Sequence, residues 1–315
     1  MTAVAHRPPP HLWAITSYFN PMRSRRRRAN YRTFRAHLTL PLVAVELAYS
    51  ADFELAEGEA DVLIQLRGGD VMWQKERLLN VALRAVPASC RKVVWIDCDM
   101  VFEAADWADR LDALLERNPL VQAFNQIHYQ PADWTPGAAA TSPLFTQPAV
   151  QALVTTIDTD PLASHIAIGP GASSKGGAWA ARRELLEVHG LYDACIIGGG
   201  DLALAAAVHG RFDVATRTMN DRQAEHYLQW ARPWHDRLAG QASVLDGALS
   251  HLWHGEFGDR RYRQRHEGLR PFAFDPFEDL ALDHNGAWRW NTDKPAMHAY
   301  VLAYFASRRE DGGAQ

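Results

Sequence analysis

The sequence has few cysteines, no long apolar run and no strong excess of charge of either sign. Cys90, Cys98 and Cys195 are widely spaced and form no CxxC pair, which argues against a disulfide framework or a zinc ribbon. No stretch approaches the ~20 apolar residues of a membrane-spanning helix, and the first residues show no signal peptide pattern. The net charge of −4 gives no overall basic field for nucleic acid. We therefore expect a cytoplasmic protein with reduced thiols, no transmembrane segment and no nucleic-acid partner.

One charged run stands out from this ordinary composition. The segment "RSRRRRAN", residues 23–30, places four arginines in succession at Arg25–Arg28. It has two readings: the solvated start of a helix, or a cationic loop that meets phosphates or an anionic surface. The sequence leaves both open.

Strand and helix patterns alternate through the first part of the chain. Apolar runs predict strands, and apolar positions at helical spacing predict helices. The strands are expected at residues 12–20, 42–49, 61–70 and 93–96, and the helices at 25–38, 73–86 and 105–118. Because the strands are apolar throughout rather than alternating, they predict an α/β fold with a mostly parallel central sheet covered by helices on both faces.

The later part of the chain is less regular. Residues 130–150 are rich in Pro, Ala, Thr and Ser and predict an irregular connection between two halves, the second beginning near Ile166. From Pro271 onward the chain reads as an extension that ends in a helix, "PAMHAYVLAYFASRR". No internal repeat is visible.

The segment "VVWIDCDMVF", residues 93–102, ends a buried strand with two carboxylates, Asp97 and Asp99. Parallel α/β sheets bind ligands beyond the carboxyl ends of their strands. On an extended chain, residues i and i+2 point the same way, roughly 7 Å apart. Two such carboxylates suit Mg²⁺ or Mn²⁺, and a cation would relieve their repulsion. The alternative is that both acids only cap a loop.

These residues are part of a wider resemblance. "WIDCDMVF" resembles the DxD element of GT-A fold glycosyltransferases, which use nucleotide-sugar donors. "KGGAWAARRELLEVHGLYD", "IIGGGDLALAAA" and "LSHLWHG" follow in the order found in the family 2-like, galactosyltransferase-like and N-acetylgalactosaminyltransferase-like enzymes. Two departures are that Asp201 has no second acid beside it and that Gly200 stands where the family often has Glu.

The resemblance implies a GT-A domain over residues 11–265. Its nucleotide half would cover about 11–103 and its acceptor half about 160–265, followed by an extension over 266–315. It also implies Mn²⁺ or Mg²⁺ as cofactor, a nucleotide-sugar donor with UDP as the expected nucleotide, and a glycan or other hydroxyl acceptor.

The catalytic assignment rests on Asp201, which follows the glycines Gly198, Gly199 and Gly200. Glycines let a ligand approach the backbone, and we expect Gly199 and Gly200 to contact the donor. By resemblance, Asp201 is the general base that deprotonates the acceptor hydroxyl, which would invert the configuration. The alternative is that Asp201 is the N-cap of the following helix.

The metal assignment combines Asp97 and Asp99 with a late histidine. His254 is the preferred ligand and His251 the second choice, by resemblance. Beyond them, Arg260 and Arg263 belong to an arginine-rich segment that could hold the donor diphosphate, because guanidinium groups form bidentate pairs with phosphate. A solvated surface is the other reading of that segment.

The remaining expected donor contacts are spread along the chain. Gly177 and Trp179 would form a wall of the sugar site, although a buried Trp is more often core. Lys75 and Glu76, near a helix start, read as a surface pair. Four further nucleotide contacts are expected at strand ends: Thr16, Tyr18, Glu46 and Arg67.

Two other functions remain open. A sugar-phosphate nucleotidyltransferase also pairs an α/β nucleotide domain with acidic metal ligands, although no Gly-rich basic signature follows the first strand unless the arginine run serves that role. A non-catalytic relative would bind a nucleotide sugar without transferring it.

Overall fold

The structure is a computed structural model that describes residues 11–137, 142–156 and 172–313. The expected start of the second half near Ile166 lies outside these residues, as do residues 1–10 of the N-terminal segment.

A seven-stranded sheet forms the centre of the molecule, in the order β10-β6-β9-β4-β1-β2-β3. Its strands are β1 (Leu12–Phe19), β2 (Leu42–Ala48), β3 (Val62–Arg67), β4 (Lys92–Ile96), β6 (Leu120–Gln122), β9 (Ala178–Arg182) and β10 (Ala242–Val244). All pairs are parallel except those of β9, which runs antiparallel to both β4 and β6. The predicted α/β class with a mostly parallel central sheet is confirmed.

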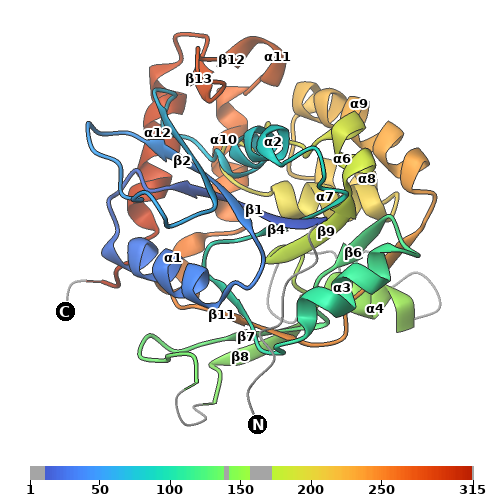
Figure 1. Ribbon diagram of the computed structural model, residues 1–315. Coiled ribbons are helices and arrows are strands. Elements are labelled where there is room, and N and C mark those ends of the chain that lie inside the picture. Colours follow the sequence, from blue (N-terminus) through green and yellow to red (C-terminus); the bar gives the residue numbers. More distant parts are fainter. Residues whose placement is uncertain (1–10, 138–141, 157–171, 314–315) are drawn as a thin grey trace, which may run out of the picture.

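Helices cover both faces of this sheet (Figure 1). Side chains of neighbouring strand residues enter opposite cores, because the side-chain period of a strand is two. Val93 and Trp95 of β4 join one core cluster, and Val94 and Ile96 join the other. The first cluster is covered by α2 (Lys75–Ala85), α6 (Arg183–His189), α7 (Gly200–Val208), α8 (Phe212–Thr216), α9 (Asp221–Leu238) and α12 (Pro295–Ser307). The second is covered by α1 (Arg25–His37) and α3 (Trp107–Leu115).

A second, four-stranded sheet has the order β5-β11-β7-β8 and lies below the central sheet in Figure 1. It contains β5 (Met100–Phe102), β7 (Gln126–Tyr129), β8 (Phe145–Pro148) and β11 (Ala248–His251). The expectation of an irregular connection over 130–150 holds for residues 130–137 and 142–144 and is wrong for its end: Phe145–Pro148 pairs with β7, and α4 (Val150–Thr156) begins two residues after it.

The remaining elements are short and lie late in the chain. They are the helices α10 (Gln264–Leu269) and α11 (Pro276–Asp279), the 3-10 turns η1 (Phe257–Arg260) and η2 (Arg270–Phe272), and the strands β12 (Leu280–Leu282) and β13 (Trp288–Trp290). Residues of this late part, such as Phe274, Met297 and Phe305, are buried in the same core cluster as β4 and α2. Within the described residues, no helix has both the length and the apolar character needed to cross a membrane.

Candidate functional site

Asp97 and Asp99 follow β4 and diverge from each other. The expected extended geometry is wrong, because residues 98 and 99 form a turn in which Met100 N donates to Asp97 O at 3.1 Å. The backbone of Asp97 is held against β9 by its N–H, which donates to Gly177 O at 2.9 Å. The turn sends Asp97 toward α2 and α7 and sends Asp99 toward the end of β11, so the two acids belong to two different clusters.

We call the first cluster the histidine side: Asp99, His251 and His254. One ligand atom from each residue lies within 4.8 Å of the others. His251 is the last residue of β11, and the chain then turns so that the His254 ring stacks on it with ring centroids 5.0 Å apart. Leu252 N donates to Asp99 O at 2.8 Å, which ties this turn to the one after β4.

The histidine side presents acceptor atoms to a common point. Arg260 Nη2 lies 3.1 Å from His254 Nε2, and since a guanidinium only donates, that nitrogen carries a lone pair. Asp99 Oδ2 lies 3.1 Å from the same nitrogen, and Asp99 Oδ1 is buried with no hydrogen-bond partner among the described residues. Acceptors without a proton between them are a donor set that fits a divalent cation, which would replace the Arg260 hydrogen bond at His254 Nε2.

The protonation of these groups agrees with that fit. Burial lowers the pKa of His251 to about 3, and burial together with Arg260 lowers the pKa of His254 to about 4. Although burial opposes the shift, the pKa of Asp99 lies below its usual range, with the cationic Arg27 among the causes. At neutral pH the cluster is two neutral imidazoles and one carboxylate, which are the forms that bind metal.

We call the second cluster the lysine side: Lys75, Asp97 and Asp201. Lys75 Nζ lies 2.6 Å from Asp97 Oδ1 and 2.8 Å from Asp201 Oδ1. Lys75 is the first residue of α2 and its side chain is 8% exposed, so the interpretation of Lys75 and Glu76 as a surface pair is wrong. Although burial opposes the shift, Asp201 and Asp97 raise the pKa of Lys75 well above its ordinary value. The lysine side therefore contains its own cation.

Glu76 is a further buried acid beside this cluster. Burial and the nearby Asp201 raise the pKa of Glu76 to about 8, although Lys75 opposes the shift. Its carboxyl group lies against the first residue of α7, where a side chain on Gly200 would collide with Glu76 Oε1. In the same way, a Cβ on Gly176 would lie 2.5 Å from Asp201 Oδ2. These two glycines are needed for close packing around the acids.

Asp201 is the second residue of α7 and does not cap it. The N-cap is Gly199, whose φ of 109° is open to glycine but strained for other residues. The Asp201 carboxylate instead accepts from Lys75 and is 37% exposed, enough to reach a ligand. The N-cap interpretation of Asp201 is thus wrong, while its use as a base stays a prediction.

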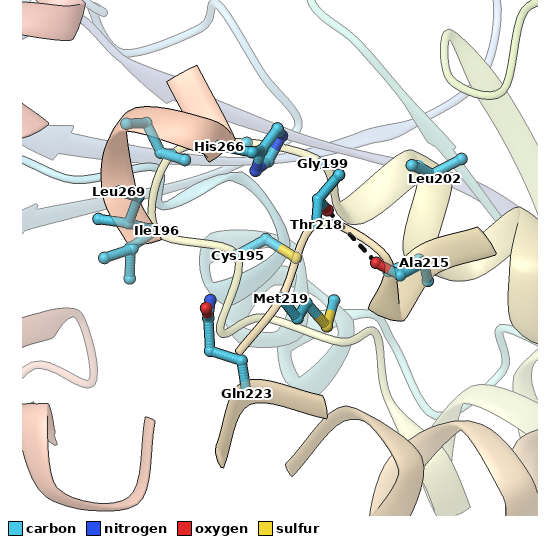
Figure 2. Close-up of a pocket in the computed structure, with 13 residues that line it drawn as sticks. Cys195, Ile196, Gly199, Leu202, Ala215, Thr218, Met219, Gln223, His266 and Leu269 are labelled. Carbon is cyan, nitrogen blue, oxygen red and sulfur yellow. Dashed lines mark hydrogen bonds between the residues drawn. The ribbon is translucent and has the colours of Figure 1, made fainter. Parts of the chain in front are cut away.

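The turn at Gly198 and Gly199 is covered by the chain itself. A Cβ on Gly198 would lie 3.1 Å from the Arg265 guanidinium, and one on Gly199 would lie 3.1 Å from the His266 ring. Beneath the turn is a cavity of about 20 Å³, lined mainly by apolar residues that include Cys195 and Met219 (Figure 2). That volume suits about one water molecule, so this cavity is not a substrate site.

The arginines expected to hold the diphosphate differ in position. Arg260 is buried, donates to His254, and also lies 3.2 Å from the Tyr262 hydroxyl through Nη1. Arg263 is exposed and pairs with Glu267 at 2.7 Å, one helical turn further on. The structure thus brings Arg260, and not Arg263, to the histidine side.

Several expected contact residues are engaged with the protein. Thr16 Oγ1 donates to Ile96 O at 2.7 Å, and the Tyr18 hydroxyl donates to Glu54. Glu46 is buried and accepts from two backbone N–H groups and from Gln65 Nε2. Arg67 donates to Ala51 O at 2.7 Å. These hydrogen bonds fix β1, β2 and β3 to neighbouring segments of the protein, and none of them indicates a ligand site.

Trp179 lies in the core and Gly177 at the start of β9. Trp179 is 1% exposed and its indole N–H donates to Lys175 O at 2.7 Å. A Cβ on Gly177 would lie 3.3 Å from Leu249 and Phe124 side chains, and its φ is +95°. Gly177 therefore supports the site through its carbonyl bond to Asp97, and the indole packs away from solvent.

His11, Asp112 and Glu116 also lie close enough together to hold an ion, and they contrast with the histidine side. Here the ammonium of Lys92 already lies 2.7 Å from Asp112 Oδ1 and pairs with Glu116 as well. This cluster, like the lysine side, contains its own cation.

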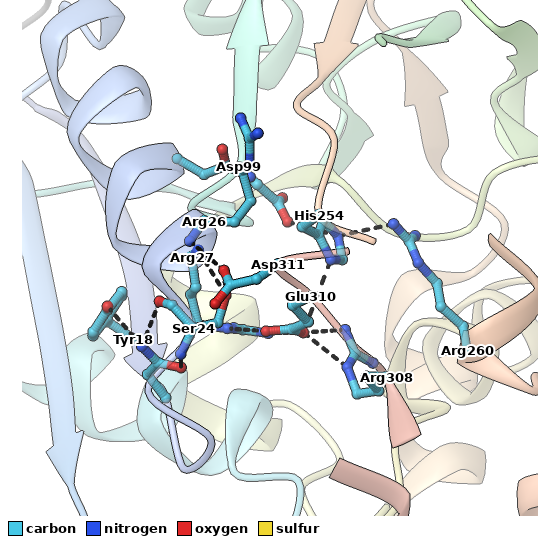
Figure 3. A network of polar contacts seen from close by, with 12 residues as sticks. Tyr18, Ser24, Arg26, Arg27, Asp99, His254, Arg260, Arg308, Glu310 and Asp311 are labelled. Atoms are coloured by element: carbon cyan, nitrogen blue, oxygen red, sulfur yellow. Dashed lines mark hydrogen bonds and ion pairs between the residues drawn. The ribbon is translucent and has the colours of Figure 1, made fainter. Parts of the chain in front are cut away.

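A third group of residues lies beside the histidine side and was not expected from sequence patterns. Arg27, Arg308 and Glu310 form a buried ion-pair network next to His254 (Figure 3). The only signal for it was the arginine run at the start of α1, since Arg308 and Glu310 lie almost 300 positions further on.

Comparison with known proteins finds structural likenesses but no family. No protein family matches the sequence, and no curated protein matches it. TarS 1-349 from S. aureus matches at 14% identity and a TM-score of 0.38, over 94% of this chain and 71% of that one. The catalytic domain of Drosophila beta1,4galactosyltransferase 7 matches at 11% identity and 0.38, over 92% and 98%.

A third similar structure is a 4-diphosphocytidyl-2C-methyl-D-erythritol synthase from Anaerococcus prevotii. It matches at 10% identity and a TM-score of 0.34, over 75% of this chain and 86% of that one. At such scores these likenesses carry no argument about the reaction, which depends on the residues of this chain.

Proposed function

We propose that this chain is a metal-dependent glycosyltransferase of the GT-A type, which moves a sugar from a nucleotide-diphosphate donor, with UDP as the expected nucleotide, to an acceptor hydroxyl. The observation that carries the proposal is the pair of clusters after β4: a cation-binding donor set at Asp99, His251 and His254, and a partly exposed acid at Asp201. Both lie beyond the carboxyl end of a parallel strand, the usual ligand position in such sheets.

Asp99, His251 and His254 would hold the metal, and the two imidazoles favour Mn²⁺ over Mg²⁺, because imidazole is a poor ligand for Mg²⁺. When bound, the cation would neutralise the diphosphate as it leaves. Arg260, buried against His254, would add a second positive charge to the same end of the donor. Asp97 would support the site through Lys75.

Asp201 would take the proton of the acceptor hydroxyl. As the acceptor oxygen bonds to the anomeric carbon, the bond from that carbon to the diphosphate breaks and the diphosphate leaves with the electron pair. Lys75 fixes one carboxylate oxygen of Asp201 at 2.8 Å, which leaves the other oxygen to accept the proton. Attack opposite the leaving group would invert the configuration.

The first test is a thermal-shift panel of UDP, GDP, CDP and ADP, with and without Mn²⁺, on the wild type and on Asp99→Asn. A ligand at 100 times its dissociation constant adds about 2.7 kcal/mol to the free energy of unfolding, which is easily detected. We expect one nucleotide to stabilise the wild type only with metal, and Asp99→Asn to abolish the effect. No response to any nucleotide would refute the proposal.

A second assay distinguishes the reaction class. Donor hydrolysis or transfer supports a glycosyltransferase, whereas release of pyrophosphate from a nucleoside triphosphate and a sugar phosphate would identify a nucleotidyltransferase instead. Binding with neither reaction, across many acceptors, would identify a non-catalytic relative.

A further inference from the structure

The arginine-rich start of α1 is covered by an acidic segment from far along the chain. We call residues 308–311 the strap. Asp311 accepts from the backbone N–H groups of Arg25 at 3.1 Å and Arg26 at 2.7 Å, and from Ser24 Oγ at 2.7 Å (Figure 3). The first N–H groups of a helix lack partners within it and carry partial positive charge, so they form an anion site. The strap supplies the anion.

Glu310 occupies the adjoining position. Arg27 donates to both of its carboxylate oxygens, through Nε at 2.9 Å and Nη2 at 2.7 Å, and Arg308 also pairs with Oε1 at 2.8 Å. The Arg27 side chain is 16% exposed and that of Glu310 is 10% exposed. A guanidinium fork of this kind suits a phosphate as well as a carboxylate.

A donor beside Glu310 is left unused. His254 Nδ1 lies 3.9 Å from Glu310 Oε1, too far for a hydrogen bond, and has no other partner among the described residues although His254 is 8% exposed. Since His254 Nε2 carries the lone pair that faces Arg260, Nδ1 is the nitrogen that holds the proton. The two oxygens of Glu310 serve the arginines and leave this N–H unsatisfied, whereas a phosphate offers at least three oxygens.

We propose that Ser24, Arg27, His254 and the first N–H groups of α1 form a phosphate-binding cradle, and that Glu310 and Asp311 are a built-in occupant which a diphosphate displaces. The identity of that ligand as the donor's diphosphate rests on the proposed function. Phosphate binding by the cradle does not, because it needs neither metal nor sugar.

The rest of the arginine run supplies a matched control. The Arg28 side chain pairs with Glu59 at 2.5 Å, and the Arg26 guanidinium donates to Ala132 O at 3.1 Å. Of these three arginines, only Arg27 directs its side chain at the strap. Glu59→Gln therefore removes an acid that faces the same helix without opening the cradle.

Isothermal titration with pyrophosphate in the presence of EDTA tests the proposal. We expect Glu310→Gln to bind pyrophosphate at least about tenfold more tightly than the wild type and than Glu59→Gln, because a charged competitor has been removed from the arginine fork. Adding Arg27→Gln to Glu310→Gln should abolish the gain. Equal affinity in Glu310→Gln and Glu59→Gln would show that the strap is only a structural ion pair.

Hydrogen exchange on the wild type gives a test that needs no variant. Saturating pyrophosphate should speed amide exchange in residues 308–312, because the strap leaves the cradle, and slow it at Arg25 and Arg26. Unchanged exchange in both segments at saturation would overturn the proposal even if Glu310→Gln does not fold.

The two proposals fail in distinguishable ways. Metal-free pyrophosphate binding in Glu310→Gln without any transfer activity would keep the cradle and refute the glycosyltransferase. Metal-dependent nucleotide binding and sugar transfer, with an immobile strap and no gain in Glu310→Gln, would do the reverse.

Discussion

The histidine side and the lysine side begin two residues apart on one turn and solve the same electrostatic problem differently. Asp97 is neutralised by Lys75, which reaches it at 2.6 Å. Asp99 meets neutral imidazoles and keeps one buried oxygen without a partner among the described residues. A buried carboxylate needs a compensating charge. Lys75 supplies it to Asp97 in direct contact, whereas the guanidinium groups of Arg27 and Arg260 act on Asp99 without an ion pair among the described residues. The comparison indicates that Asp99, and not Asp97, is available to an added cation.

Asp99→Asn should have the largest effect on this comparison. If the histidine side alone holds the metal, this change removes its only charged ligand, and we expect kcat/KM for sugar transfer to fall at least about 10³-fold, since metal stabilisation of a leaving group contributes several kcal/mol. Steady-state kinetics across a Mn²⁺ titration measure it. Asp236→Asn, which changes an exposed acid on α9, should leave the rate unaltered.

Asp201→Asn should have the second largest effect on activity, and it tests the lysine side alone. An amide keeps a bond to Lys75 but takes no proton, so we expect kcat to fall about 10²-fold or more, within the range of general base catalysis. Metal-dependent nucleotide affinity should stay at the wild-type value in the thermal-shift assay. Loss of nucleotide binding in this variant would show that the two sides are one site.

Lys75→Met removes the cation that makes the lysine side self-sufficient. Because both carboxylates keep partial contact with water, we expect the free energy of unfolding to fall by about 3 kcal/mol, the low end for breaking a buried ion pair. Urea denaturation measures the loss. Lys294→Met, which breaks a pair with buried Asp279, should also destabilise the protein but should leave kcat unchanged.

Glu76 gives an effect on stability alone, visible as a pH dependence. Its pKa rises from 4.5 unfolded to about 8 folded, so between these values the folded state binds the extra proton. Stability from this group is full below about pH 4.5 and is lost as pH rises through about 8. Between pH 5 and pH 8 we expect the wild type to lose about 3.5 kcal/mol more than Glu76→Gln, measured by urea midpoints. Parallel pH profiles would contradict the buried-acid assignment.

The sequence predicted the strands and helices of the fold better than the side-chain contacts of the site. The runs that became β1, β2 and β4 were apolar throughout, and helix α2 showed its buried face by periodicity, so local patterns were sufficient. The geometry of Asp97 and Asp99 was not local, because a turn replaced the extended backbone directly after β4. The apolar pattern of a strand does not indicate the residue at which the extended backbone gives way to a turn.

Lys75 and the strap show why the sequence did not predict the other contacts of the site. Lys75 begins helix α2 beside Glu76, the usual pattern of a solvated helix start, and its partners Asp97 and Asp201 lie 22 and 126 positions away. Glu310 meets Arg27 across 283 positions. Such contacts depend on tertiary packing, which neither charge nor spacing in one sequence encodes.

The place of β9 in the sheet has a consequence for the order of folding. This strand, Ala178–Arg182, lies between β4 and β6, which precede it in the chain. A nascent chain ending before residue 178 would therefore hold two unpaired strand edges flanking a gap, the arrangement that invites association between chains. The gap closes only when β9 emerges from the ribosome. β10 (Ala242–Val244) pairs with the other edge of β6 later, and the histidines follow β9 by some seventy residues. Long-range closure of this kind predicts slow folding during synthesis, with ligand binding acquired last.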